Sequence, residues 1–198
     1  AAEKPAADTL FQLLPSDETG IDFNNEVKDT KDFNIFQYRN FYNGAGVSIG
    51  DINNDGLADI FFTANQQQNR LYLNKGNLKF EDITEKAGIK NVHQWHTGVI
   101  MADVNGDGWL DIYVCNGGNI TDDDRANELY INQQNGTFLE KANEYGLDDK
   151  GLSTHASFFD YDHDGDLDCF VLNNSTRSTE SFGYSRSVRH IRDKINGD

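Results

Sequence analysis

The sequence predicts an all-β fold built from repeated units of four antiparallel strands. One nine-residue acidic loop occurs three times, and short runs of β-branched and aromatic residues, which favour strands, flank each copy. A later stretch of the first unit, residues 69–74, recurs in the second unit as residues 127–132, and both contain a Leu-Tyr pair and end in Asn. Four short strands in a unit of roughly 40–60 residues are typical of a β-propeller blade.

The first 40 residues precede the repeats, and we expect them to form an N-terminal tether and lead-in segment. Residues 1–9 are small and polar and include a proline, as is typical of a tether. Residues 19–23 are compatible with a short strand. Residues 24–40 are polar with scattered aromatic side chains, and we predict an irregular conformation for them.

The repeats are expected to occupy residues 41–198, as units 41–90, 91–148 and an incomplete unit 149–198. Each unit should run strand, acidic loop, strand, connection, strand, turn, strand. The predicted strands around the loops are 46–50, 60–63, 98–102, 112–115, 155–159 and 169–172, and later strands follow around residues 71–73, 80, 129–131 and 138. The third unit ends before its Leu-Tyr strand, since residues 173–198 are expected to be a connection.

About two and a half blades are therefore expected, whereas a propeller closes with roughly four to eight. We expect the chain to be a fragment of a longer protein whose full length supplies further blades. Completion by other chains is the alternative. The absence of an initial methionine before Ala1 suggests that a leader was removed or that the chain was cut from a longer one.

The three acidic loops, residues 51–59, 103–111 and 160–168, fit the pattern D-x-[DN]-x-D-G-x-x-D. Oxygen-bearing side chains stand at positions 1, 3, 5 and 9, and the glycine at position 6 permits a sharp turn. Calcium prefers about six to eight oxygen ligands in a flexible cage. We therefore predict up to three Ca²⁺ ions, one in each loop. The candidate ligands, with position 7 acting through its backbone carbonyl, are Asp51, Asn53, Asp55, Leu57 and Asp59; Asp103, Asn105, Asp107, Trp109 and Asp111; and Asp160, Asp162, Asp164, Asp166 and Asp168.

The sequence of these loops allows two other interpretations. An EF-hand needs a glutamate at position 12 and a helix on each side, but Phe62, Val114 and Val171 stand at that position and strand-like runs flank the loops. Metal-free hairpin turns rich in Asp, Asn and Gly are the second alternative. The recurrence of the same ligand spacing in all three copies favours metal binding.

Much of the negative charge of the chain comes from the carboxylates of these loops. The formal net charge is −16, and the ligand positions carry three carboxylates in the first loop, three in the second and four in the third. This acidity argues against a nucleic-acid partner, which would require a basic patch. No apolar run of about 18 residues is present, so we expect no membrane span, and we find no signal peptide, although a lipid anchor upstream is left open.

The two cysteines are Cys115 and Cys169. Their offsets from the preceding loops have opposite parity, so we expect their side chains to point to opposite faces of their strands. This favours two free, buried thiols over a disulfide. Weak calcium sites indicate an extracellular setting, where dissociation constants of about 10⁻⁴–10⁻³ M are useful.

The units resemble the FG-GAP, or VCBS, repeats of integrin α-subunit propellers and of many secreted bacterial proteins. The resemblance covers residues 41–172 and rests on residues 41–46 before the first loop, residues 95–98 before the second, and the Leu-Tyr-x-Asn strands. It implies a calcium-binding, seven-bladed propeller with calcium between the first two strands of a blade. The third unit departs from the pattern, since His155 and Ala156 replace the usual glycine. The lead-in resembles that of bacterial surface lipoproteins, which implies a bacterial surface or secreted type and leaves an outer-membrane lipoprotein open.

These observations predict a module of a secreted or cell-surface protein that binds a protein or glycan partner and uses calcium mainly for structure. The alternatives are a propeller domain of a polysaccharide-active enzyme and a scaffold subunit of a surface complex. We predict no enzymatic activity, because neither G-x-S-x-G nor H-E-x-x-H occurs. His93 and His96 could bind a transition metal, but no third ligand accompanies them, so a packing role is favoured.

Overall fold

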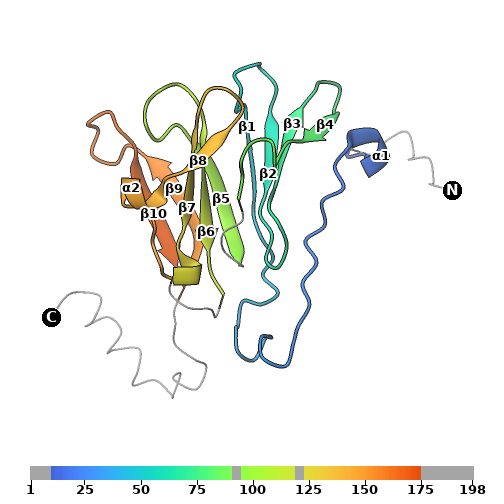
Figure 1. Cartoon of the computed structure of the whole chain (residues 1–198), viewed down its shortest axis with the longest axis vertical. Helices are drawn as coiled ribbons and strands as arrows, with labels where there is room; N and C mark the ends of the chain where they lie inside the picture. The colour runs from blue at the N-terminus through green and yellow to red at the C-terminus, as the bar shows by residue number, and fades with distance from the viewer. Residues whose placement is uncertain (1–9, 91–94, 119–122, 175–198) are drawn as a thin grey trace.

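Three antiparallel sheets stand side by side in the computed structural model, which describes residues 10–90, 95–118 and 123–174 (Figure 1). We call these sheets blade 1, blade 2 and blade 3. Blade 1 contains β1 (Val47–Gly50), β2 (Asp59–Phe62), β3 (Arg70–Asn74) and β4 (Phe80–Asp82). Blade 2 contains β5 (His96–Ala102), β6 (Asp111–Asn116), β7 (Glu128–Asn132) and β8 (Phe138–Glu140), and blade 3 contains β9 (Ser153–Phe159) and β10 (Asp168–Asn173).

Neighbours in the sequence are neighbours in each sheet: the strand orders are β1-β2-β3-β4, β5-β6-β7-β8 and β10-β9. The predicted all-β class, the four-stranded antiparallel units and the strands on either side of each acidic loop are confirmed. The arrangement of four, four and two strands is consistent with a partial propeller. The short strands and tight turns form because β-branched and aromatic runs alternate with Asn- and Gly-rich segments.

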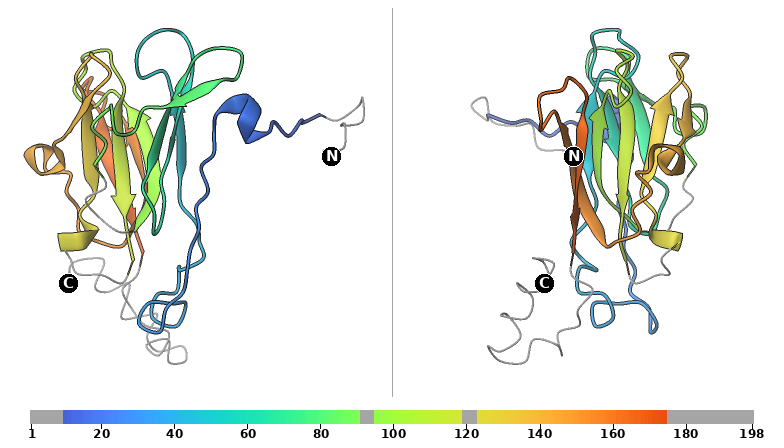
Figure 2. Two further views of the ribbon diagram at one scale, coloured as in Figure 1. Left: turned by 45° about the vertical axis from the view of Figure 1, so that its right-hand side comes forward. Right: turned by 90° about the vertical axis from the view of Figure 1, so that its left-hand side faces the viewer.

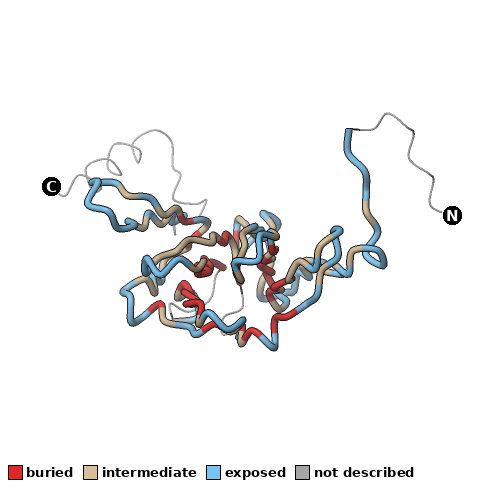
Figure 3. Tube along the Cα trace, turned by 90° about the horizontal axis from the view of Figure 1, so that it is seen from above, coloured by how far each residue is buried: buried red, intermediate tan, exposed pale blue. Residues whose placement is uncertain are grey.

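The core lies between the blades, because alternate residues of a strand face opposite sides of its sheet. Phe61 and Leu71 of blade 1 pack against Ile112 of blade 2 in one cluster, while Tyr113 and Leu129 of blade 2 face blade 3. Every residue of β6 and β7 is buried, whereas β10 has no buried residue. The buried segments therefore concentrate in the middle of the row of blades (Figure 3).

The inner strands β1, β5 and β9 approach one another closely at two glycines. A methyl group at Gly46 would lie 2.8 Å from the carbonyl oxygen of Thr97, and one at Gly98 would lie 2.5 Å from the carbonyl oxygen of Thr154. Because these contacts are to backbone atoms, a side chain would have to push the strands apart.

The lead-in segment contains a short helix, α1 (Ser16–Thr19), and no strand at residues 19–23, so the possible strand there is wrong. Gly20 ends the helix in the left-handed conformation, with φ of 81°. The chain then runs along the outer face of blade 1 (Figure 2), where the Phe23 ring stacks on Phe62 with centroids 4.8 Å apart and the Tyr72 hydroxyl donates to Asp22. Residues 24–40 contain no helix or strand, as predicted.

The remaining short elements are η1 (Asp123–Arg125) and α2 (Ala142–Tyr145). No described helix is long and apolar enough to cross a membrane. The expected tether at residues 1–9, His93, and residues 175–198 of the expected connection lie outside the described residues.

Both cysteines are free thiols, as predicted, although only Cys115 is fully buried and Cys169 is partly buried. They point to opposite faces of their own blades, but blades 2 and 3 face each other, so both thiols belong to the same core cluster. Burial raises the pKa of Cys115 to about 12 and that of Cys169 to about 11.

Candidate functional site

The three acidic loops lie at the same end of the molecule (top of Figure 1), where each joins the first and second strands of its blade. They connect β1 to β2, β5 to β6, and β9 to β10. The flanking elements are strands in all three copies, so the structure excludes an EF-hand at these loops.

Position 1 of each loop closes the turn through backbone hydrogen bonds. In the first loop the Asp51 carboxylate accepts from the N–H groups of Asp55 (3.1 Å) and Gly56 (2.7 Å). Asp103 accepts the same two bonds from Asp107 and Gly108 in the second loop. The loop conformation is therefore specified within its own nine residues.

Position 4 adopts a left-handed backbone in all three loops, with φ of 57° at Asn54, 71° at Gly106 and 63° at His163. This conformation was not predicted from the sequence. The residue types at position 4 could have indicated it, since Asn, Gly and His are among the residues that tolerate a left-handed backbone best.

Position 9 is buried in blades 1 and 2. The two carboxylate oxygens of Asp59 accept from the N–H of Ile52 (3.0 Å) and the N–H of Asn74 (2.7 Å). Asp111 accepts equivalent bonds from Val104 (3.1 Å) and Asn132 (2.8 Å). Neither aspartate has exposed surface.

This burial has an electrostatic consequence. Removal from water raises the pKa of Asp59 and raises that of Asp111 to about 6, because the charged form is disfavoured and the neighbouring loop aspartates add like charge. A cation in the loop would offset both effects.

In blade 3 the same position is open. Asp168 accepts from the N–H of Tyr161 (2.8 Å), the equivalent of the Ile52 and Val104 bonds, but the side chain is exposed. No third strand among the described residues supplies a second N–H group to Asp168.

The third loop also gathers the most negative charge. Carboxylate oxygens of Asp160, Asp162 and Asp168 lie within 4.8 Å of one another, and Asp160 Oδ1 is buried without a hydrogen-bond partner among the described residues. The side chain of Asp164 raises the pKa of Asp166, as expected where carboxylates crowd together. An oxygen-only, anionic donor set with an unpartnered oxygen fits a hard divalent cation.

The first two loops differ in their centres, where position 3 is asparagine. The Asn53 amide donates to Asp55 (3.0 Å), and the Asn105 amide donates to Asp107 (3.0 Å). Within the described residues, the aspartates of these two loops do not form a trio as close as that of the third. The ligand roles predicted for all three loops, including the position 7 carbonyls of Leu57, Trp109 and Asp166, stay predictions.

Two asparagines that the sequence reasoning did not single out as site residues brace the first two loops. The Asn74 side chain donates to the carbonyl of Ala58 (2.8 Å). The Asn132 side chain donates to the carbonyls of Leu110 (3.1 Å) and of Ile52 (2.8 Å) in the neighbouring loop. The recurrence of an asparagine at the end of both Leu-Tyr strands could have indicated that these residues support the loops.

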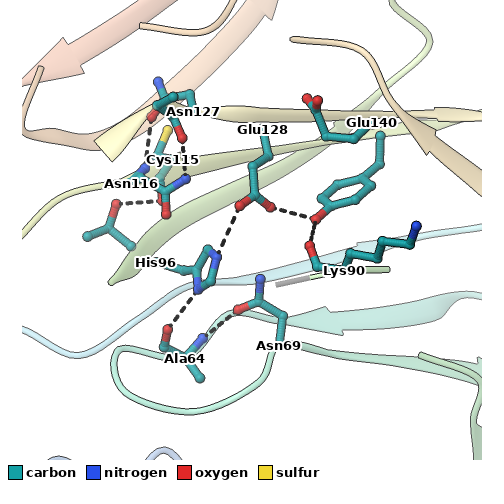
Figure 4. Close-up of polar contacts among 12 residues, drawn as sticks. Ala64, Asn69, Lys90, His96, Cys115, Asn116, Asn127, Glu128 and Glu140 are labelled. Atoms are coloured by element: carbon teal, nitrogen blue, oxygen red, sulfur yellow. Dashed lines mark hydrogen bonds and ion pairs between the residues drawn. The ribbon is translucent and has the colours of Figure 1, made fainter. Parts of the chain in front are cut away.

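His96 is buried at the opposite end of β5, between blades 1 and 2 (Figure 4). Its Nε2 lies 3.4 Å from Glu128 Oε1, and its Nδ1 lies 3.2 Å from the carbonyl oxygen of Ala64. The Tyr130 hydroxyl donates to the other oxygen of Glu128 (2.6 Å). This arrangement joins the two blades and agrees with the packing role expected for His96.

Comparison with known proteins finds similarity to three animal proteins over part of the chain. Cartilage acidic protein 1 is 41% identical in Xenopus tropicalis, 42% in Mus musculus and 41% in Homo sapiens, in each case over 69 residues. These matches cover 35% of this chain and 10–11% of each relative, so the matched part of the chain spans about a tenth of the length of these relatives.

The FG-GAP-like repeat is found at residues 51–114 and again at residues 118–171. The first match begins at the first acidic loop and ends within β6, so it contains the first two loops. The second match begins just after β6 and ends within β10, so it contains the third loop. This extent covers more than half of the chain, and the chain therefore belongs to the family of FG-GAP-like repeat proteins.

Proposed function

We propose that this chain is a calcium-stabilised binding module of an extracellular or cell-surface protein, which recognises a protein or glycan partner. The observation that carries the calcium assignment is the third loop, where three carboxylates converge and Asp160 Oδ1 is buried without a described partner. The same ligand spacing in the first two loops extends the assignment to one ion in each loop.

Calcium has mainly a structural role in this proposal. When bound, the ion supplies positive charge that neutralises the clustered carboxylates. The loop side chains then hold the end of the first strand against the start of the second strand in each blade. Asp59 and Asp111 also bond to β3 and β7, so ion binding stabilises three strands of each complete blade.

An extracellular setting is supported by one finding and one physical argument. The relatives are named cartilage acidic protein 1. If the loops bind calcium weakly, as extracellular modules commonly do, they fill only where free calcium is abundant. A bacterial surface protein, as suggested by the lead-in sequence, would satisfy the same calcium requirement.

Further blades from the full-length protein are part of the proposal. The far face of blade 3 exposes Phe170 and Leu172, which are 60% and 53% exposed. Large apolar side chains on a sheet face are typical of a surface that another sheet covers. No observation specifically favours the enzyme or the scaffold alternative.

Calorimetry and thermal unfolding test the calcium assignment. Titration with calcium should show binding, and millimolar calcium should raise the melting temperature, since each site adds about 2.7 kcal/mol at a hundredfold excess over its dissociation constant. Magnesium is the control ion, because it demands a smaller octahedral site. An unchanged melting temperature, together with no calcium in elemental analysis, would refute the assignment.

The binding function is tested separately, with a glycan array and a polysaccharide depolymerisation assay on the calcium-loaded chain. Array binding without depolymerisation supports a binding module. Depolymerisation would replace this proposal with the enzyme alternative.

A further inference from the structure

A cavity of about 300 Å³, lined by both apolar and polar groups, lies at the end of the inner strands opposite the acidic loops. It is bounded by the segment that leads into β1, by Trp95 and Thr97 at the start of β5, and by Thr154 and His155 of β9. All three blades therefore contribute to one cavity. Its volume is at the lower end of the range of small-ligand sites, which is about 300–1,000 Å³.

One wall of the cavity is closely packed. Trp95 is buried and packs against the rings of Tyr38 and Phe41, with centroids 5.5 Å and 5.1 Å away. The Tyr38 hydroxyl is hydrogen-bonded to the Asn40 side chain and to the backbone of Gly118. A cavity that is already shaped costs little reorganisation when a ligand binds.

Two polar side chains in the lining have unused hydrogen-bonding capacity. Asn43 and His155 are exposed, and no described residue forms a hydrogen bond with either side chain. The amide of Asn43 offers donors and an acceptor, and the imidazole of His155 offers two ring nitrogens for hydrogen bonding.

His155 stands at a position that is glycine in the other two blades. Gly46, Gly98 and His155 each lie five residues before the first aspartate of their loop. Gly46 is covered by backbone of the adjacent inner strand. Gly98 is covered by backbone of Thr154 and by the His155 imidazole, which also lines the cavity. Blade 3 thus places a hydrogen-bonding group where the other blades have no side chain.

The described residues of the lining include no Asp, Glu, Lys or Arg, although the chain carries a net charge of −16. A sulfated or uronic-acid ligand is typically bound by lysine or arginine, and the described lining contains neither. A folded protein partner would need about 800 Å² of surface on each side, far more than such a cavity offers. A small, neutral ligand with many hydroxyl groups matches the amide, imidazole and hydroxyl groups present.

We propose that this cavity at the end of the inner strands binds one unit of a neutral saccharide, with Asn43 and His155 as its principal hydrogen-bonding side chains. The inference rests on the proposed binding function and specifies its ligand class and its site.

The test is binding of the calcium-loaded full chain to an array of neutral hexose and N-acetylhexosamine oligosaccharides, with sulfated and uronic-acid oligosaccharides on the same array. The best neutral oligosaccharide is then titrated by calorimetry against Asn43→Ala and His155→Ala. Each variant should weaken binding at least tenfold without changing the melting temperature, because both side chains are exposed. Gln67→Ala is the control, since Gln67 is exposed and lines a different hollow, and it should bind like the parent chain.

Four results would overturn the proposal. Neutral-saccharide binding that neither variant weakens would place the site elsewhere and leave the binding function intact. Preference for sulfated or uronic-acid ligands would refute the neutral class. Absence of all array binding, with a protein partner recovered by cross-linking, would refute the saccharide site but support the binding function, whereas absence of any partner would contradict both.

Discussion

The acidic loops of blades 1 and 2 differ from the loop of blade 3 in how the blade supports the same motif. Asp111 in blade 2 is fully buried. The N–H of Asn132, at the end of β7, donates to the carboxylate oxygen that the loop N–H of Val104 leaves unbonded. Asp168 in blade 3 forms the local bond to Tyr161 but is exposed, since no described third strand lies beside it. The motif therefore specifies the shape of the loop, and the neighbouring strand determines its burial.

Calcium removal should affect the unsupported loop most. The third loop has the closest carboxylates and the fewest bonds to other strands, so repulsion there is opposed by less structure. Addition of EDTA should accelerate amide exchange at Tyr161 and Gly165 about a hundredfold, which matches the 2.7 kcal/mol of a well-filled site. Exchange at Ile52 and Val104 in the first two loops should accelerate less, as hydrogen-exchange mass spectrometry would reveal. Equal acceleration in all three loops would remove the distinction.

Truncation at position 9 tests the comparison directly. Asp111→Ala leaves two N–H groups without their acceptor, and each buried unsatisfied donor costs about 1–3 kcal/mol. We expect a loss of about 3 kcal/mol or more in the free energy of unfolding, measured by urea denaturation in EDTA. Asp168→Ala, the matched variant in blade 3, should cost about 1 kcal/mol or less. A larger loss for Asp168→Ala would contradict the difference in support.

Contact between blades 2 and 3 can be tested at Gly98. Gly98→Ala would place a methyl group against the backbone of Thr154 and His155, and overpacking of this kind costs about 1–3 kcal/mol. Gly106→Asn is the control, because Asn54 adopts the same left-handed conformation at the equivalent loop position. It should change the melting temperature little, whereas Gly98→Ala should lower it. A harmless Gly98→Ala would mean that the inner strands are not closely packed.

Thiol labelling should show the smallest difference. At pH 8 both thiols are protonated, because burial raises their pKa values above the usual range, to about 12 for Cys115 and about 11 for Cys169. Cys169 belongs to the open blade and is only partly buried, so iodoacetamide should modify it first. Mass spectrometry of timed samples measures the order, and urea should make both thiols react equally fast. Earlier labelling of Cys115 would show that blade 2 is not the better-protected blade.

Local patterns were sufficient to predict the strands and the acidic loops. Turn residues and β-branched runs act over a few positions, and the bonds that close each loop join residues four or five positions apart. The strands around the loops and the Leu-Tyr strands were therefore predicted correctly. The short helix α1 was missed, since residues 16–20 contain no periodic apolar pattern that distinguishes it from an extended segment.

The sequence by itself determined the blade pattern, the loop conformation and the positions of the candidate calcium ligands. The tertiary structure decided which loop aspartates are buried, that Asn132 reaches the carbonyl of Ile52, and that His96 pairs with Glu128. These contacts join residues 32–80 positions apart or depend on a strand from elsewhere in the blade. No local pattern encodes such contacts, because they arise only when separate strands and blades pack against one another.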